Sequence, residues 1–307
     1  MDRAAGTGPP AISVTGLHKR YADVVAVDDI SFEVAAGEFF GILGPNGAGK
    51  TTTLEMVEGL RRPDAGAVQL FGESAWPRKP ALLLRMGVQL QASAFFERLT
   101  SREQIRTFGA LYGVPADRAD AWLDTVGLSD KASTRTEQLS GGQLQRLAIA
   151  CALVHEPELV FLDEPTAALD PQARRNLWDL LRSLNESGRT VVLTTHYMDE
   201  AEALCDRVAI MDHGRILKMD SPVELVRSLG APVRIRVAPR LLDPAEAAAL
   251  ESVDAVESDG SDVVLTTHAP SAVLGALAER DALDGLQVSG ATLEDVFLEL
   301  TGREYRA

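Results

Sequence analysis

The sequence has few cysteines and no long apolar run, and each shortage excludes a class of protein. Two cysteines in 307 residues, Cys151 and Cys205, are too few for a disulfide framework or a zinc site. We expect both to be buried free thiols. No stretch approaches the roughly 18 consecutive apolar residues of a transmembrane helix. The N-terminus also lacks the basic and apolar regions of a secretory signal. The expected location is cytoplasmic, with any membrane association made through a partner.

Basic residues are also scarce. The chain has 30 Lys and Arg against 45 Asp and Glu, a net charge of −15. Nucleic acids are bound through clustered Lys and Arg, so this balance argues against nucleic acid as a partner. A single nucleotide is not excluded, because it needs only one cation and backbone amides. The charge is uneven, with −7 in residues 1–230 and −8 in residues 231–307.

Apolar strand patterns and helical patterns alternate over most of the chain. A continuous apolar run occurs at 39–43, buried-strand patterns occur at 159–162, 191–194 and 208–211, and an alternating strand pattern covers 30–34. Strands that alternate with helices predict an α/β fold with a mainly parallel sheet. Residues 95–155 read mostly as helices and look inserted into this core.

The character of the chain changes near residue 230. The last part follows the order strand, helix, strand, strand, helix, strand, which predicts a small α+β domain of ferredoxin-like type. A final helix follows, with Thr292 as its N-cap and Asp295 three residues later. We therefore expect a flexible tail over 1–10, one domain over 11–230 with a helical subdomain at about 95–155, and an accessory domain over 231–307.

A phosphate-binding loop follows the first continuous apolar run. Residues 44–51 match G-x-x-x-x-G-K-[ST], and they lie between a strand pattern and a helix pattern. The glycines let backbone N–H groups converge on phosphates, and the helix N-terminus adds positive potential. Lys50 would reach the β- and γ-phosphates and Thr51 would ligate Mg²⁺. We assign nucleotide binding to Gly44, Pro45, Asn46, Gly47, Ala48, Gly49, Lys50, Thr51 and Thr52. Alone, this loop leaves kinases and GTPases open.

An acidic pair ends the apolar run at 159–162. Asp163 and Glu164 would face the nucleotide if this run is a sheet strand. Asp163 is placed to hold Mg²⁺, and Glu164 is placed to orient and polarise an attacking water. Taken alone, two solvated acids at a strand end would be the simpler interpretation. Together with the loop at 44–51, the catalytic interpretation is favoured.

A short motif narrows the class. Leu139-Ser140-Gly141-Gly142-Gln143 opens a helical pattern that runs to Leu153. With the loop and the acidic pair, it makes residues 12–220 resemble the ATP-binding cassette of ABC transporters. The resemblance implies a P-loop cassette with a mainly parallel sheet, an antiparallel β part and an inserted helical subdomain. It implies that residues 140–143 bind the γ-phosphate of ATP held by a second copy, in a homodimer with two ATP molecules. ATP and Mg²⁺ are the implied cofactors.

The resemblance assigns four further positions. Tyr21 matches the aromatic residue that stacks on adenine, and Asp170 matches a loop that crosses the dimer interface. Gln91 matches a residue that senses Mg²⁺ and the attacking water, although Gln89 is a rival. His196 matches the switch histidine that contacts the γ-phosphate. Glu164, His196, Lys50 and Gln91 are the implied catalytic residues, and Thr51, Gln91 and Asp163 are the implied metal ligands.

Two further resemblances concern the biological role. The segment 134–138 lacks the stretch typical of exporters with fused membrane domains. This implies a separate integral-membrane permease subunit, with this chain bound to it at the cytoplasmic face of the membrane. The stretch 292–303 resembles the tail of ATPases from daunorubicin/doxorubicin-type drug exporters. This implies ATP-driven efflux of a drug or natural product. The alternative is a soluble ABC ATPase of translation or DNA repair, but such chains usually carry two cassettes, a zinc module or a coiled coil.

Overall fold

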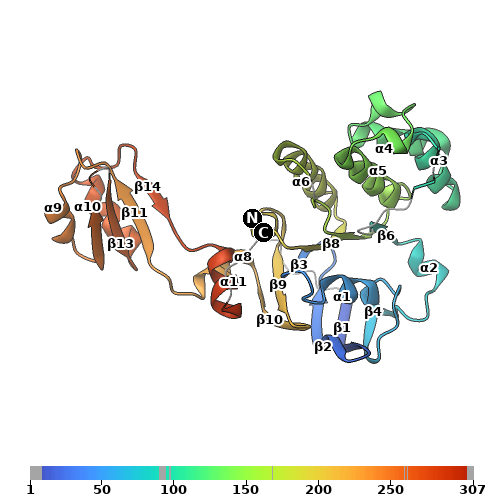
Figure 1. Cartoon of the computed structure of the whole chain (residues 1–307), viewed down its shortest axis with the longest axis horizontal. Helices are drawn as coiled ribbons and strands as arrows, with labels where there is room; N and C mark the ends of the chain where they lie inside the picture. The colour runs from blue at the N-terminus through green and yellow to red at the C-terminus, as the bar shows by residue number, and fades with distance from the viewer. Residues whose placement is uncertain are drawn as a thin grey trace. The chain divides into compact units, whose positions relative to one another are not determined.

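The structure is a computed structural model that describes residues 9–89, 95–96, 98–167, 169–258, 260 and 262–302 (Figure 1). The chain divides into two compact units, here called unit 1 (residues up to Pro222) and unit 2 (residues from Val223). The division lies at the start of α8 (Pro222–Arg227), ahead of the boundary that we propose at residue 230. Within the described residues, no helix is long and apolar enough to cross a membrane.

A six-stranded sheet forms the centre of unit 1. Its order is β10-β9-β3-β8-β7-β6, and all neighbours are parallel except β9 and β10. Every residue of β3, β7 and β8 is buried, as expected for strands covered on both faces. The strands are β3 (Phe39–Leu43), β6 (Met86–Gln89), β7 (Leu159–Asp163), β8 (Thr190–Thr195), β9 (Arg207–Asp212) and β10 (Arg215–Asp220). The predicted parallel core is confirmed.

An antiparallel sheet supplies the second β layer of unit 1. Its order is β2-β1-β4-β5, with strands β1 (Ile12–Tyr21), β2 (Val24–Val34), β4 (Ala65–Leu70) and β5 (Glu73–Ser74). Side chains of both sheets share one apolar core, in which the stacked rings of Phe32 and Phe40 are 5.2 Å apart. Helix α1 (Lys50–Val57) contributes Leu54 and Met56 to this core.

The segment between β6 and β7 forms a helical block with its own core. Ile105 from α3 (Ser101–Leu111), Leu123 from α4 (Ala116–Thr125) and Leu147 from α5 (Gly141–Leu153) meet there. Because β6 and β7 are neighbours in the central sheet, the block is an insertion, as the resemblance implied. The remaining helical elements of unit 1 are α2 (Pro80–Leu83), α6 (Pro171–Glu186), α7 (Met198–Leu204) and short 3₁₀ turns at Ser129–Lys131 and Thr136–Gln138. Cys151 and Cys205 are buried free thiols, as predicted.

Unit 2 contains the predicted ferredoxin-like arrangement. Four antiparallel strands lie in the order β12-β13-β11-β14, with α9 between β11 and β12 and α10 between β13 and β14. The elements are β11 (Val233–Val237), α9 (Pro244–Ala248), β12 (Ala255–Ser258), β13 (Val263–Thr267), α10 (Pro270–Ala278), β14 (Gln287–Ser289) and α11 (Leu293–Thr301). Thr292 caps α11 in a capping box with Asp295, as predicted.

Gly87 sets the approach of α5 to the central sheet. A Cβ at this position of β6 would lie 2.3 Å from the carbonyl oxygen of Ala152 on α5. We expect Gly87→Ala to lower the free energy of unfolding of unit 1 by about 2 kcal/mol, the usual cost of overpacking a tight contact. Urea unfolding followed by tryptophan fluorescence reports on unit 1, because all three tryptophans, Trp76, Trp122 and Trp178, lie there. Gly275→Ala on α10 adds the same methyl group into open space and should leave this transition unchanged. An unchanged midpoint for Gly87→Ala would contradict the prediction.

Candidate active site

The loop between β3 and α1 has the shape that a phosphate-binding loop requires. The central strand β3 ends at Leu43 and α1 begins at Lys50. A Cβ on Gly44 would lie 2.2 Å from the carbonyl oxygen of Met211, and one on Gly49 would lie 2.2 Å from that of Ala26. Gly49 also has a φ of 99°, in the region that favours glycine. The neighbouring backbone therefore leaves room only for glycine at both positions.

Lys50 is a buried cation with three oxygen partners. Its ammonium Nζ donates to the carbonyl oxygens of Gly44, at 2.8 Å, and Pro45, at 3.2 Å. It also lies 3.2 Å from Glu164 Oε1, in an ion pair whose side chains are 4% and 9% exposed. A charge at this depth requires such partners, because burial without them costs several kcal/mol. Lys50 thus places one positive charge inside the loop.

Asp163 ends β7 and is held by two threonines. Thr51 Oγ1 at the start of α1 donates to Asp163 Oδ1 at 3.3 Å, and Thr194 Oγ1 on β8 donates to the same oxygen. Asp163 and Thr194 are direct neighbours in the register of the parallel strands. Burial raises the pKa of Asp163 above its ordinary value, while its two threonine hydrogen bonds oppose that shift.

Glu164 joins Lys50 to His196. Its Oε2 lies 3.3 Å from His196 Nδ1, just after β8, while its Oε1 faces Lys50. The backbone of Glu164 has a φ of 47°, an uncommon conformation for a residue with a side chain. Its N–H is fixed by Thr194, donating to Oγ1 at 3.0 Å. Three residues far apart in sequence therefore meet at one point.

A second buried carboxyl group lies near Asp163. Glu58 follows α1 and is 2% exposed, and neither of its carboxyl oxygens has a hydrogen-bond partner among the described residues. Burial raises its pKa from 4.5 to about 9, and the charge of Asp163 adds to the shift. Glu58 is therefore protonated and neutral at pH 7. Gln89 ends β6 beside this edge of the sheet and is buried. The other glutamine candidate, Gln91, lies outside the described residues.

Tyr21 is the last residue of β1, in the β1–β2 hairpin that lies next to the P-loop. Ala26 of this hairpin is the residue whose carbonyl oxygen crowds Gly49. The Tyr21 ring is partly exposed and faces the side chains of Lys19 and Arg61, at 5.6 and 5.3 Å. Within the described part of the chain, it makes no ring, ion-pair or hydrogen-bond contact with residues 44–51. Its assignment to adenine stays a prediction.

The motif at 139–143 begins α5 in the helical block. Ser140 is the N-cap of α5: its hydroxyl accepts from Gln143 N at 3.3 Å, and its N–H donates to Gln143 Oε1 at 2.9 Å. Ser140 and Gly141 are exposed. Gly142 packs on Leu169 just before α6, where an added Cβ would lie 3.3 Å from its side chain. No described contact links Ser140 to Lys50 or Glu164, so this chain does not bring the two halves of the predicted site together.

Asp170 and Glu200 fix the segments that follow the acidic pair and His196. Asp170 caps α6 by accepting from the N–H groups of Gln172 and Ala173, at 3.0 and 2.9 Å. Glu200 on α7 is fully buried and accepts from Trp178 Nε1 on α6 at 3.1 Å. This bond joins α6 and α7, the two helices that begin next to the site. Burial raises the pKa of Glu200.

The residues present fit a magnesium ion shared with a nucleotide. Mg²⁺ is usually held in proteins by one or two carboxylates together with substrate phosphates and water. Thr51 Oγ1 and Asp163 Oδ1 converge at the mouth of the loop and supply the hard oxygen ligands that Mg²⁺ prefers. Over the described ranges, no group of three His, Cys, Asp or Glu side chains could hold a metal by itself. Thr51 and Asp163 thus fit a magnesium ion only together with oxygen ligands from a nucleotide or water.

Fold and site together define the class. A parallel sheet with a P-loop, an acidic pair and an inserted helical block is the ATP-binding cassette fold. The family model described as ABC transporter matches residues 27–167. Solved structures agree: one titled as the ATP-binding subunit of an ABC transporter has a TM-score of 0.65, 28% identity, and covers 72% of this chain and 93% of its own. The dimeric MJ0796 cassette has a TM-score of 0.64 and 28% identity, with 68% and 98% covered.

Curated relatives match along almost the whole chain. "Nod factor export ATP-binding protein I" of Ralstonia nicotianae is 40% identical, over 97% of this chain and 95% of that protein. The protein of the same name from Burkholderia lata is 41% identical, over 95% and 97%. The chain therefore belongs to the ABC transporter family, as an ATP-binding subunit. Membership in this family implies ATP binding and hydrolysis.

Three residues of the site were not identified from sequence. Thr194 is a polar residue at the end of an apolar strand, the same signal that marked Asp163, and could have been found in this way. Glu58 and Glu200 look like ordinary surface residues of amphipathic helices. Their burial depends on how α1 and α7 pack, which no local pattern reveals.

Glu58 predicts a pH dependence of stability. The folded chain keeps a proton on Glu58 up to about pH 9, whereas the unfolded chain loses it near pH 4.5. Because the folded state binds the extra proton, this stabilisation is complete below pH 4.5 and is lost as the pH rises toward 9. We expect Glu58→Gln to flatten this slope, so that wild type loses about 2 kcal/mol more than the variant between pH 6 and 8. Urea unfolding at pH 6 and at pH 8 measures the free energy of unfolding of both proteins. The exposed control Glu33→Gln should keep the wild-type slope, and equal slopes for Glu58→Gln and wild type would refute the assignment.

Proposed function

We propose that the chain is the ATP-hydrolysing subunit of a bacterial ABC exporter and that it drives efflux through a separate permease. The observation that carries this proposal is the meeting of Lys50, Glu164 and His196 beside the Thr51–Asp163 pair. This set contains a phosphate cation, a carboxylate for water and a histidine in contact with that carboxylate. The names of the curated relatives, which refer to export, support the direction of transport.

Each residue has one role in the proposed hydrolysis. Lys50 binds the β- and γ-phosphates together with the N–H groups of residues 44–52. Glu164 orients the attacking water and accepts its proton, while His196 contacts the γ-phosphate and is positioned by its contact with Glu164. Thr51 and Asp163 would hold Mg²⁺, which neutralises charge on the phosphates when bound. Gln91 is the remaining proposed catalytic residue and metal ligand, and Tyr21 stacks on adenine.

The proposed active unit is a homodimer. Ser140 and Gly141 are exposed, and they begin a helix whose N-terminal amides favour an anion. In a head-to-tail dimer, Ser140, Gly141, Gly142 and Gln143 of one copy bind the γ-phosphate held by Lys50 of the other. Asp170 caps α6 and lies in the segment that would cross the interface. The solved structure of a dimeric cassette with the same fold supports this assembly.

The proposed partner is an integral-membrane permease, which places the chain at the cytoplasmic face of the membrane. The tail resemblance to ATPases of daunorubicin/doxorubicin-type exporters supports a drug or natural product as cargo, and the relatives are named for Nod factor export. Affinity purification from detergent-solubilised membranes tests the partner. Recovery of a permease without its own ATPase domain supports an exporter. Recovery with ribosomes or DNA, and no permease, would instead favour a soluble ABC ATPase.

A substitution at Glu164 tests ATP hydrolysis separately from ATP binding. We expect Glu164→Gln to keep ATP binding and to lose at least about 99% of the hydrolysis rate, because the phosphate contacts remain while the water loses its carboxylate. Phosphate release and equilibrium ATP binding measure the two effects. Glu186→Gln, at the exposed end of α6, is the matched control and should hydrolyse ATP like wild type. Hydrolysis by Glu164→Gln near the wild-type rate would remove Glu164 from the mechanism.

Lys50 tests the phosphate site. We expect Lys50→Ala to weaken ATP binding about tenfold or more, the loss expected for a charged hydrogen-bond partner. Fluorescent ATP-analogue titration measures the change. Lys131→Ala, on an exposed 3₁₀ turn, removes a lysine without changing the site and should bind as wild type does. Unchanged affinity in Lys50→Ala would show that the nucleotide binds elsewhere.

A further inference from the structure

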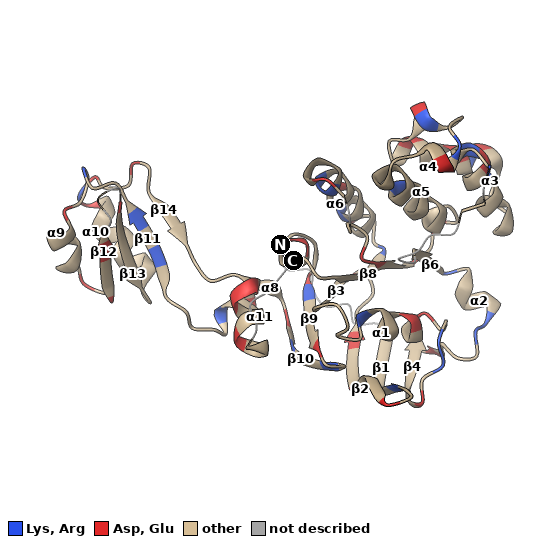
Figure 2. Ribbon diagram, in the orientation of Figure 1, with Lys and Arg blue, Asp and Glu red and all other residues tan. Residues whose placement is uncertain are grey.

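Within the described residues of unit 2, the helices α9 and α10 both pack on one face of the sheet. Ile235, Val237, Val263 and Leu265 are buried in one apolar cluster with residues of α9 and α10. Since side chains alternate along a strand, the residues between them lie on the opposite face. On that face Arg234 and Arg236 are exposed and Val264 is half-buried. Figure 2 shows β11 as a basic strand among acidic segments.

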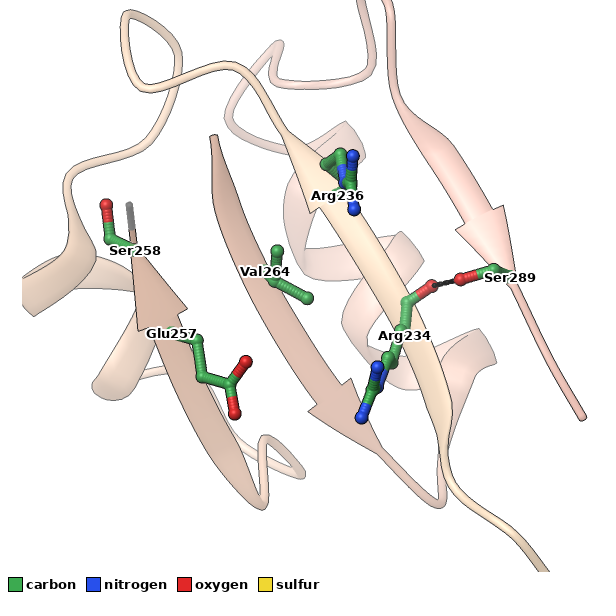
Figure 3. Close-up of a pocket in the computed structure, with 6 residues that line it drawn as sticks. All are labelled: Arg234, Arg236, Glu257, Ser258, Val264 and Ser289. Atoms are coloured by element: carbon green, nitrogen blue, oxygen red, sulfur yellow. Dashed lines mark hydrogen bonds between the residues drawn. The ribbon is translucent and has the colours of Figure 1, made fainter. Parts of the chain in front are cut away.

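The sheet face opposite α9 and α10 carries a pocket of about 420 Å³. Its lining residues are Arg234, Arg236, Glu257, Ser258, Val264 and Ser289, drawn in Figure 3. Arg236, Val264 and Glu257 are direct neighbours across β11, β13 and β12, so they form one row. Arg234 and Ser289 pair across β11 and β14 in the next row. The volume lies within the range of small-molecule sites.

The positively and negatively charged side chains of this pocket come from different strands. Arg236 and Glu257 are separated by two strand spacings, about 10 Å between backbones, with Val264 between them. Arg236 instead lies 3.7 Å from Asp262. Neither Arg234 nor Glu257 has an ion-pair partner in the part of the chain that the structure describes. Residues 231–307 have a net charge of −8, and yet no described carboxylate lies within ion-pair distance of Arg234.

We propose that this pocket binds a small zwitterion, with a carboxylate or phosphate at one end and an ammonium group at the other. The guanidinium groups of Arg234 and Arg236 bind the anionic end through charge-assisted hydrogen bonds, and the Ser289 hydroxyl lies in the same row as Arg234. Glu257 binds the ammonium group, and the Val264 side chain contacts the apolar link between the ends. The proposal is independent of ATP hydrolysis, because every residue of the pocket belongs to unit 2.

The charge pattern decides between occupants. A nucleic acid would face Glu257 and the acidic remainder of unit 2, which repel phosphates. A simple anion would leave Glu257 unused, and a simple cation would leave both arginines unused. A zwitterion uses all three charged groups, with its anionic end on β11 and its cationic end on β12.

Titration calorimetry on the full chain tests the site with three matched probes. Phosphoethanolamine carries both charges, inorganic phosphate carries the anion alone, and ethanolamine carries the cation alone. We expect phosphoethanolamine to bind with a Kd of about 1 mM or tighter, and each single-charge probe to bind about tenfold more weakly. Arg234→Gln and Glu257→Gln should each weaken phosphoethanolamine binding about tenfold. Arg240→Gln, an exposed arginine of unit 2 that pairs with Asp284 outside the pocket, is the control and should bind as wild type.

Several outcomes would overturn the proposal. Absence of phosphoethanolamine binding at about ten times the expected Kd would do so. Equal binding of phosphate and phosphoethanolamine, unaffected by Glu257→Gln, would make the pocket a plain anion site. Sedimentation of wild type and both variants covers a second copy as occupant: a dimer that dissociates on Arg234→Gln and Glu257→Gln would assign the face to self-association. Circular dichroism confirms that the exposed substitutions leave the fold intact.

Discussion

The ion pair between Lys50 and Glu164 is the contact on which the site depends. A lysine that is 4% exposed must have negative partners, and it finds two loop carbonyls and one carboxylate. Glu164 can reach it only because β7 ends beside β3's neighbour β8 in the parallel sheet. The pair also indicates how the proposed hydrolysis would begin. The γ-phosphate would replace Glu164 as the anion at Lys50, and this would free the carboxylate to act on water.

The edge of the parallel sheet explains why these residues meet. In parallel strands all carboxyl ends lie at one edge, so the polar residues that follow apolar strands converge there. Asp163 and Thr194 are register neighbours, and Leu43, the last residue before the loop, pairs with Thr195. Buried there, the Asp163 carboxylate accepts hydrogen bonds from Thr51 and Thr194. The Thr194 hydroxyl contacts both the Asp163 carboxylate and the Glu164 backbone N–H.

Local patterns predicted the elements but not the side chains that packing buries. Strand runs such as 159–162 and the turn between Leu43 and Lys50 carry strong local signals, so the sheet, the loop and the acidic pair could be predicted. The order of elements in the last part likewise predicted the ferredoxin-like sheet. Glu58 could not be predicted, because its burial depends on the contact of α1 with the sheet. The pocket at Arg234 also escaped sequence analysis, since strand register across β12, β13 and β11 brings its residues together.

We propose that each composite site of the homodimer holds Mg–ATP between two copies of the chain. The most direct measurement is a crystal structure of the full chain with Mg²⁺ and a non-hydrolysable ATP analogue. We expect Lys50 Nζ to contact the β- and γ-phosphates, Mg²⁺ to lie at Thr51, and Ser140 of the second copy to contact the γ-phosphate. Lys50 still paired with Glu164 while the nucleotide is bound elsewhere, or a γ-phosphate with no contact from a second copy, would contradict it.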